Sequence, residues 1–303
     1  MAKVGRIILW ILAGLLALIA ITAAVNWDTI QRVLLGGVKV YETTPPKMPA
    51  AINRPAILIF SKTNGYRDDA AVAAGNALFA SIARKQGWGH FQTENGATFS
   101  PDILKRFDAV VFNNVSGDVF TPEQRSALKA YIENGGGFVA VHGAGGDHSY
   151  DWKWYVNELI GAQFIGHTMN PQFPQATLRI EDTNHPATAG MKPEWIRSDE
   201  WYAFDKSPRE KGYHILVSID ESTYEPKGLF GQDVSMGKDH PMVWWHCQGK
   251  GRALYSALGH RPEAYAEPQY QAMLLGATEW ALRLKGDGCE TPAPPANPAK
   301  AGN

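Results

Sequence analysis

Four short runs that we expect to be strands, each separated from the next by a helical or turn pattern, constrain the fold more than any other feature of the sequence. The runs are Ala56–Phe60, His90–Glu94, Asp108–Val115 and Phe138–His142. Strands that alternate with helices need crossover connections, and these favour right-handed, parallel arrangements. The sequence therefore predicts a doubly wound α/β domain with a mostly parallel sheet and helices on both faces.

Helix signals between these runs support the same prediction. Val72, Leu78, Phe79 and Ile82 follow a helical pattern after the first run, and Thr121 caps a second helix that has Pro122 at its first position. The later strands are less regular. They are predicted at 176–181, 214–219, 242–247 and 252–258, with a turn at 248–251 that adds an antiparallel hairpin, and a closing helix over 267–284.

An apolar segment at the N-terminus determines the expected compartment. Nineteen uncharged residues, Ile7–Val25, follow Lys3 and Arg6, and in a helix they span roughly the hydrocarbon layer of a bilayer. We favour a membrane anchor over a cleaved signal, which would use the small residues at 22–24. In either case Lys3 and Arg6 stay on the cytoplasmic side of the membrane. The domain is therefore expected on the periplasmic or extracellular side.

The chain then divides into four parts. These are a membrane anchor or signal segment (1–25), a linker (26–54), the α/β domain (55–285) and a disordered Pro- and Ala-rich tail (286–303). Only Cys247 and Cys289 occur, and Cys289 falls in the tail. We expect no disulfide framework, and we interpret Cys247 as an inert small residue in an apolar strand, with a Cys247–Cys289 pair as the less favoured alternative.

Charge and aromatic content indicate the kind of ligand. The 29 basic and 30 acidic residues nearly balance, so the chain has no strong electrostatic field that would attract nucleic acid. Ten Trp and eleven Tyr suit a flat neutral ligand such as a sugar, or they simply fill the core. The expected partners are a small carbohydrate and, through residues 7–25, a membrane; a homo-oligomer is one assembly that the sequence allows.

No nucleotide or flavin is expected as a cofactor. Ser61–Gly65 occupies the place of a flavodoxin phosphate loop, but Asp68 and Asp69 would occupy the positive end of the following helix and repel a phosphate. Neither a Walker sequence nor a GxGxxG sequence appears in the chain.

Histidines follow the ends of several apolar runs, namely His142, His167, His246 and His260. Because the ends of parallel strands meet at one rim, His142 and His260 are expected to face a common cleft. Loop carboxylates would join them there, from the set Asp147, Asp199, Glu200, Glu221 and Asp239. Such a cluster would bind a divalent metal, such as zinc, or perform acid/base chemistry. The alternative for each histidine is a structural role, which we favour for His246.

Two further motifs bear on the chemistry. Asp199-Glu200-Trp201-Tyr202 places two acids beside two aromatic residues, which suits a sugar, although a polar turn before an edge strand gives the same pattern. The sharp turn at His142-Gly143 carries neither Cys nor Ser. This excludes an amidotransferase thiol or a serine-hydrolase elbow at that turn.

A series of short motifs resembles the ThuA-like family, which is named for trehalose utilisation. The motifs include IFSKTNGYRDD, FNNVSGDVFTPEQ, YIENGGGFVAVHGAGG, SDEWYAF, KDHPMVWWH and ALYSALGH, in order between residues 55 and 284. The resemblance implies a fold related to flavodoxins and class I glutamine amidotransferases. It also implies a carbohydrate-linked role, often alongside enzymes that oxidise sugars or glycosides to keto derivatives.

The resemblance also suggests the site. The candidate catalytic residues are His142, Glu200 and His260, and the candidate metal ligands are these three and His167. The candidate substrate-binding residues are Tyr66, Asp147, Trp152, Asp199, Tyr202, Glu221 and Tyr224. One departure is Tyr66-Arg67-Asp68, where many relatives have an aromatic residue, Arg and His. Asp68 would then replace the histidine as an oxygen ligand, or the site is altered.

The predicted function is carbohydrate metabolism, on trehalose or a keto-glycoside, by an exported, membrane-anchored protein. The reaction would be elimination, hydration or isomerisation next to a sugar carbonyl. His142 or Glu200 would take the proton, and His260 or a cation would stabilise the enolate. The alternative is a non-catalytic carbohydrate-binding or scaffold module of the cell envelope, which the missing nucleophile and Asp68 favour.

Overall fold

A computed structural model describes residues 2–146 and 150–289. Within them, one sheet has the strand order β2-β1-β3-β4-β11-β10-β9-β6-β7, and a small second sheet pairs β5 with β8. The pairings from β2 to β11 are parallel, and those from β11 to β7 are antiparallel. The strands are β1 (Ala56–Phe60), β2 (Gly89–Thr93), β3 (Ala109–Asn113), β4 (Gly137–Val141), β5 (Phe164–His167), β6 (Gln175–Ile180), β7 (Glu194–Ser198), β8 (Tyr202–Phe204), β9 (His214–Asp220), β10 (Pro241–Gln248) and β11 (Gly251–Ser256).

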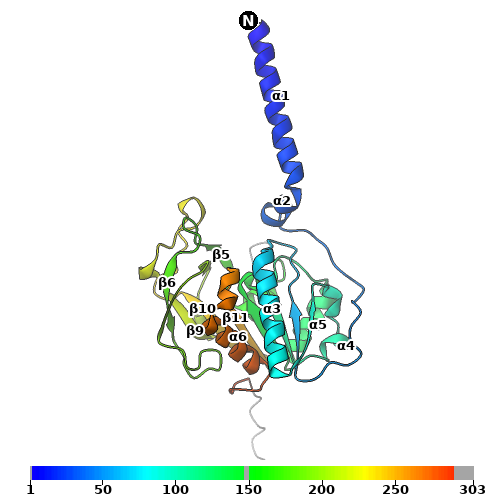
Figure 1. Cartoon of the computed structure of the whole chain (residues 1–303), viewed down its shortest axis with the longest axis vertical. Coiled ribbons are helices and arrows are strands. Elements are labelled where there is room, and N and C mark those ends of the chain that lie inside the picture. The colour runs from blue at the N-terminus through cyan, green and yellow to red at the C-terminus, as the bar shows by residue number, and fades with distance from the viewer. Residues whose placement is uncertain (1, 147–149, 290–303) are drawn as a thin grey trace, which may run out of the picture.

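The parallel half confirms the predicted α/β class. Every residue of β1, β3 and β4 is buried, as expected for strands covered by helices on both faces. Figure 1 shows α3 (Asp69–Gln86) and α6 (Pro268–Ala281) in front of the sheet. Right-handed crossovers in this strand order place α4 (Pro101–Leu104) and α5 (Pro122–Glu133) on the other face, where they pack against each other.

Local signals explain where these elements begin and turn. Thr121 caps α5 in a capping box with Gln124, and Pro122 occupies the first turn, as the sequence predicts. The β10–β11 hairpin is also confirmed, with Gln248 opposite Gly251. The sequence analysis missed β5, β7 and β8, because these strands are only three to five residues long and two of them are partly exposed.

The N-terminal helix α1 (Ala2–Val25) projects away from the α/β domain, and α2 (Trp27–Leu34) lies at its base (Figure 1). A stretch of α1, Lys3–Val25, is long and apolar enough to cross a membrane, and none of its most apolar window is buried. This helix is compatible with a membrane anchor or a signal sequence.

Residues 38–54, predicted as part of a linker, lie along the surface of the domain. The Lys62 ammonium contacts the Glu42 carboxylate at 2.5 Å and donates to the Val40 carbonyl at 2.6 Å. Gly96 N–H donates to Glu42 at 2.8 Å, and Gln124 donates to the Glu42 carbonyl at 2.7 Å. The segment that leaves α2 is therefore held on the domain by specific hydrogen bonds.

Cys247 and Cys289 form a disulfide, so the interpretation of Cys247 as a free, inert residue is wrong. Their Cα atoms lie 5.1 Å apart across a sequence separation of 42. The predicted disorder of the tail mostly concerns residues outside the described range, but residues 287 and 288 are held by Trp280 and Arg252, which donate to their carbonyl groups at 3.0 Å. The sequence alone did not reveal that the chain returns to β10 after α6.

Removal of this disulfide is expected to lower the free energy of unfolding by about 2–4 kcal/mol, because the cross-link restricts the unfolded chain. The measurement is urea denaturation of the Cys247→Ser/Cys289→Ser variant beside the wild type. Reductant should destabilise the wild type to the same extent and leave the variant unchanged. Equal stability of oxidised wild type and variant would contradict the prediction.

Candidate functional site

Three buried side chains meet where the parallel strands end, at an edge that we call the carboxyl rim, formed by the loops after β1, β3, β4 and β11. His142 follows β4, His260 follows β11, and Glu200 lies between β7 and β8. His142 Nε2 lies 3.0 Å from His260 Nδ1, and Glu200 Oε2 lies 3.4 Å and 3.2 Å from these two nitrogens. We call these residues the His-Glu-His cluster.

His142 is held in a strained backbone conformation that directs its imidazole into the cluster. Its φ of +48° falls in the left-handed region, which costs a residue with a Cβ about 1–2 kcal/mol. Two hydrogen bonds hold it there: His142 Nδ1–H donates to the Ala257 carbonyl at 2.8 Å, and the Tyr255 hydroxyl donates to the His142 carbonyl at 2.8 Å. Strain maintained in this way is typical of functional positions.

Asp199, predicted to bind substrate, is buried and holds the backbone of His260. Its carboxylate accepts hydrogen bonds from Gly259 N–H at 2.9 Å and His260 N–H at 3.2 Å, and it pairs with the Arg197 guanidinium at 3.0 Å. Gly259 has a φ of +109°, which a residue with a Cβ rarely adopts. Arg197 is buried against Trp195, and sequence reasoning missed it because a single Arg in an edge strand carries no signal.

The electrostatics of the cluster favour charged forms. Burial alone would raise the pKa of Glu200, but hydrogen bonds and charge from His142 and His260 outweigh it and hold this pKa well below its usual range. Burial would lower the pKa of His260, but Glu200, Asp68 and Asp199 outweigh it and raise this pKa. The Glu200 carboxylate is therefore ionised, and the three carboxylates around His260 favour a positive charge on its imidazole.

The hydrogen-bond pattern of the two imidazoles accommodates either a proton or a cation between them. His142 uses its Nδ1–H on Ala257, so its Nε2 presents a lone pair. His260 Nε2 faces Asp68 Oδ2 at 3.5 Å, and a proton on that nitrogen leaves a lone pair on Nδ1. Two lone pairs 3.0 Å apart beside a carboxylate repel one another unless a proton or a cation lies between them.

The geometry of the three donor atoms suits a divalent metal. Metal–ligand bonds of about 2.0–2.1 Å at tetrahedral to octahedral angles separate neighbouring ligands by about 2.8–3.4 Å. The observed separations of 3.0, 3.2 and 3.4 Å lie within that range. Carbonyl and carboxylate partners on the far nitrogens of both imidazoles are the usual support for metal-binding histidines.

The other carboxylate oxygen of Glu200, Oε1, contacts two side chains outside the cluster. Gln172 donates to Glu200 Oε1 at 2.6 Å, and His167 Nδ1 lies 3.1 Å from the same atom. His167, predicted as a metal ligand, thus contacts the cluster through Glu200 and is not one of its three donor atoms. Sequence reasoning missed Gln172, because it lies in a proline-flanked loop without periodicity.

Aromatic rings surround the cluster. The Tyr202 ring lies 4.2 Å from that of His142, and the Phe173 ring lies 5.3 Å from that of His260. Tyr66 is about half exposed (54%), and its partial burial, followed by the negative charges of Asp68 and Glu200, raises the pKa of its hydroxyl. Tyr66 and Tyr202 therefore lie beside the cluster, as a substrate-binding role requires, and Phe173 was not predicted.

The other candidates lie in different surroundings. Glu221 accepts hydrogen bonds from His240 at 2.7 Å and from two backbone N–H groups, and the Tyr224 hydroxyl lies 3.4 Å from the same imidazole. Trp152 packs on Tyr155 in an aromatic cluster of the core. Asp239 pairs with Arg209 at the surface. His246 donates to the Leu159 carbonyl and stacks on Tyr213, in keeping with the structural role favoured for it. Asp147 lies outside the described residues.

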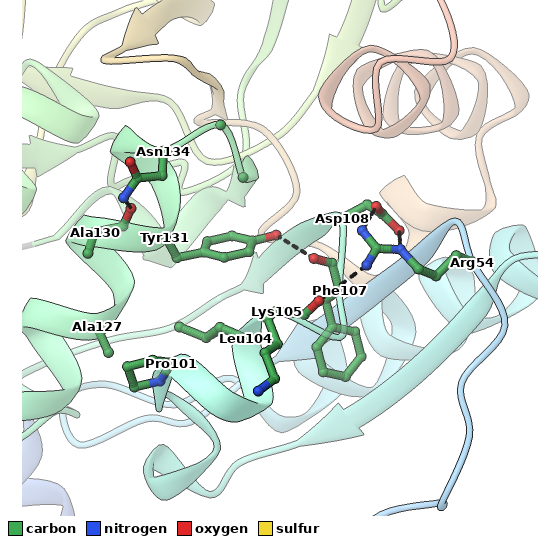
Figure 2. A pocket seen from close by; sticks show the side chains of 12 residues that line it. Arg54, Pro101, Leu104, Lys105, Phe107, Asp108, Ala127, Ala130, Tyr131 and Asn134 are labelled. Atoms are coloured by element: carbon green, nitrogen blue, oxygen red, sulfur yellow. Dashed lines mark hydrogen bonds and ion pairs between the residues drawn. The ribbon is translucent and has the colours of Figure 1, made fainter.

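A hollow of about 430 Å³ lies at the opposite rim, where the strands begin. Figure 2 shows its lining, in which Arg54 pairs with Asp108 and the Tyr131 hydroxyl donates to the Phe107 carbonyl. Asp108 also accepts from Ala56 N–H at 2.8 Å. Because these polar groups satisfy one another and hold the start of β1, we assign this hollow a structural role.

Comparison with known proteins agrees with the predicted family and with the α/β fold. A family model described as ThuA, trehalose utilisation, matches residues 56–281. A solved structure of a ThuA-like protein from Bacteroides uniformis is 26% identical, with a TM-score of 0.64, over 78% of this chain and 95% of that chain. Another from Parabacteroides merdae is 19% identical, with a TM-score of 0.57, over 78% and 91%. No curated protein matches the chain.

Proposed function

Because the chain belongs to the ThuA family, described as trehalose utilisation, over residues 56–281, we propose that it is a membrane-anchored enzyme that acts on a carbohydrate through the His-Glu-His cluster. One observation carries this proposal. When both imidazoles present a lone pair, these two nitrogens and the ionised Glu200 carboxylate converge at 3.0–3.4 Å and need a positive centre between them. We assign that centre to a divalent cation, with zinc as the first candidate.

The residues around the cluster support chemistry next to a sugar carbonyl. A divalent cation bound by His142, Glu200 and His260 would polarise a carbonyl oxygen and stabilise an enolate. Glu200 would be bound to the cation and is buried, so the proton would instead be taken by a side chain that reaches solvent. His167 and Asp68 are both adjacent to the cluster and partly exposed. Elimination, hydration and isomerisation all begin with this proton transfer.

Two features support anchoring and export. The helix α1 is apolar over Lys3–Val25 and unburied, so it is available to lipid. The Cys247–Cys289 disulfide fits an oxidising compartment outside the cytoplasm. We propose that α1 remains in the membrane and that the domain lies on the exported side.

Elemental analysis of the detergent-purified full chain tests the cluster directly. We expect about one divalent cation per chain after reconstitution, and turnover of at least one 3-keto-glycoside that stops on chelation and returns with zinc. His214→Ala is the control, because this imidazole lies on β9 and stacks on Trp245 away from the cluster. Sugar binding without turnover across the panel would contradict catalysis and favour a binding module.

A further inference from the structure

Two groups of large apolar side chains near the His-Glu-His cluster are exposed. One is α2 with Leu35, and the other is the tip of a hairpin over residues 227–233. Leu34 and Leu35 are 74% and 60% exposed, and Leu229 and Phe230 are 53% and 96% exposed. Exposure of large apolar side chains in adjacent positions is characteristic of an interaction surface.

The helix α2 is amphipathic and is fixed to the domain by its polar side. Trp27, Ile30 and Leu34 recur at the spacing of one helix face. Arg32, on a different face, pairs with Asp28 and donates to the Thr63 carbonyl at 2.8 Å. Only Asn26 separates α2 from α1. An amphipathic helix with a Trp at the end of a membrane-spanning helix lies at the lipid–water interface.

The hairpin is closed by contacts between its two arms, and its apolar tip extends beyond them. Lys227 pairs with Asp233 across the hairpin, and Gly228 N–H donates to the Gln232 carbonyl at 2.8 Å. Phe230, at the tip, has a φ of +55°, an unfavourable conformation for a residue with a Cβ. Since almost the whole Phe230 side chain is exposed, packing within the domain does not account for this arrangement.

Both surfaces flank the cluster. Arg32 holds α2 against the loop after β1, and the same loop leads to Asp68, which faces His260. Met169 N–H donates to the Lys227 carbonyl at 2.7 Å, so the hairpin rests beside His167, which contacts Glu200. Figure 1 shows α2 and β5, which carries His167, at the end of the domain from which α1 projects.

From this arrangement we infer that α2 and the Leu229–Phe230 tip dock the carboxyl rim on the bilayer surface, so that the cluster takes the sugar of a lipid-linked carbohydrate. The inference rests on the proposed anchor and the proposed carbohydrate activity. The bilayer is the occupant that the chain itself brings to this rim, because α1 enters the membrane one residue before α2. A second copy of the chain would have no such fixed position.

Fluorescence of the full chain in phosphatidylcholine nanodiscs tests the docking. The variant Phe230→Cys carries an environment-sensitive NBD label, and Lys105→Cys is the matched control, because Lys105 is exposed at the opposite rim. The native cysteines are disulfide-bonded and do not react. We expect a blue-shifted emission at position 230 that doxyl-labelled lipids quench, and neither effect at position 105. Emission at 230 that matches the control would overturn the docking.

The substrate class is tested with two keto-glycosides in the same nanodiscs, one with a methyl aglycone and one with a long alkyl aglycone that enters the bilayer. The wild type is expected to prefer the alkyl compound at least about tenfold in kcat/KM, because partition concentrates it at the membrane. Leu229→Asp/Phe230→Asp should remove this preference and leave the methyl compound unaffected. A preserved preference would overturn the inference. Absence of turnover on both compounds would overturn the proposed activity, while the fluorescence result would still decide the docking.

Discussion

Glu200→Gln is expected to abolish both binding of the proposed divalent cation and the proposed turnover. The substitution preserves the size of the side chain but deletes the negative charge that faces His142 and His260 at 3.4 and 3.2 Å. The amide would also direct an N–H or a neutral oxygen at the two imidazole lone pairs. Loss of a partner outside the ligand shell costs about 10–100-fold in metal affinity, so loss of a ligand should cost more. Zinc titration calorimetry and steady-state kinetics measure the two effects.

The matched control for this variant is Glu194→Gln. Glu194 is also a glutamate of the β7 region, but it is exposed and pairs with Arg179 at the surface. Its loss should leave cation content and turnover unchanged. Circular dichroism should show that both variants are folded. If Glu200→Gln retained the cation and full activity, the His-Glu-His cluster would not be the functional site.

Asp199→Ala is expected to lower the free energy of unfolding by about 3–5 kcal/mol, because it breaks a buried ion pair and leaves one charge behind. The side chains of Arg197 and Asp199 are 2% and 0% exposed, and Glu267, the other carboxylate near Arg197, lies 3.5 Å away. The change also removes the acceptor for the N–H groups of Gly259 and His260. Urea denaturation measures the loss.

Glu194→Ala provides the comparison for this prediction, since it breaks an ion pair in which both side chains are more than half exposed. Exposed pairs contribute about 0–1 kcal/mol, so this variant should remain close to the wild type in stability. A loss for Asp199→Ala as small as that for Glu194→Ala would show that Arg197 does not depend on Asp199. Asp199→Ala should also weaken cation binding, because Asp199 fixes the backbone of His260.

Much of the parallel half of the fold was predictable because its signals are local. The buried strands β1, β3 and β4 are continuous apolar runs, and Thr121 with Pro122 marks the start of α5 within four residues. The antiparallel half was less predictable. Its edge strand β7 alternates buried and exposed residues over only five positions, which is too short for a periodicity to be recognised.

By itself, the sequence determined the α/β class, the apolar N-terminal helix, the family resemblance and the placement of histidines after strand ends. Only the tertiary structure decided which of them meet: His142 and His260 are 118 residues apart and lie 3.0 Å from each other, while His246 bonds the Leu159 carbonyl. It also decided that Asp199 positions His260 and that Cys289 returns to β10. The physical reason is that strand and helix periodicity depend on neighbours along the chain, whereas these contacts depend on how distant elements pack.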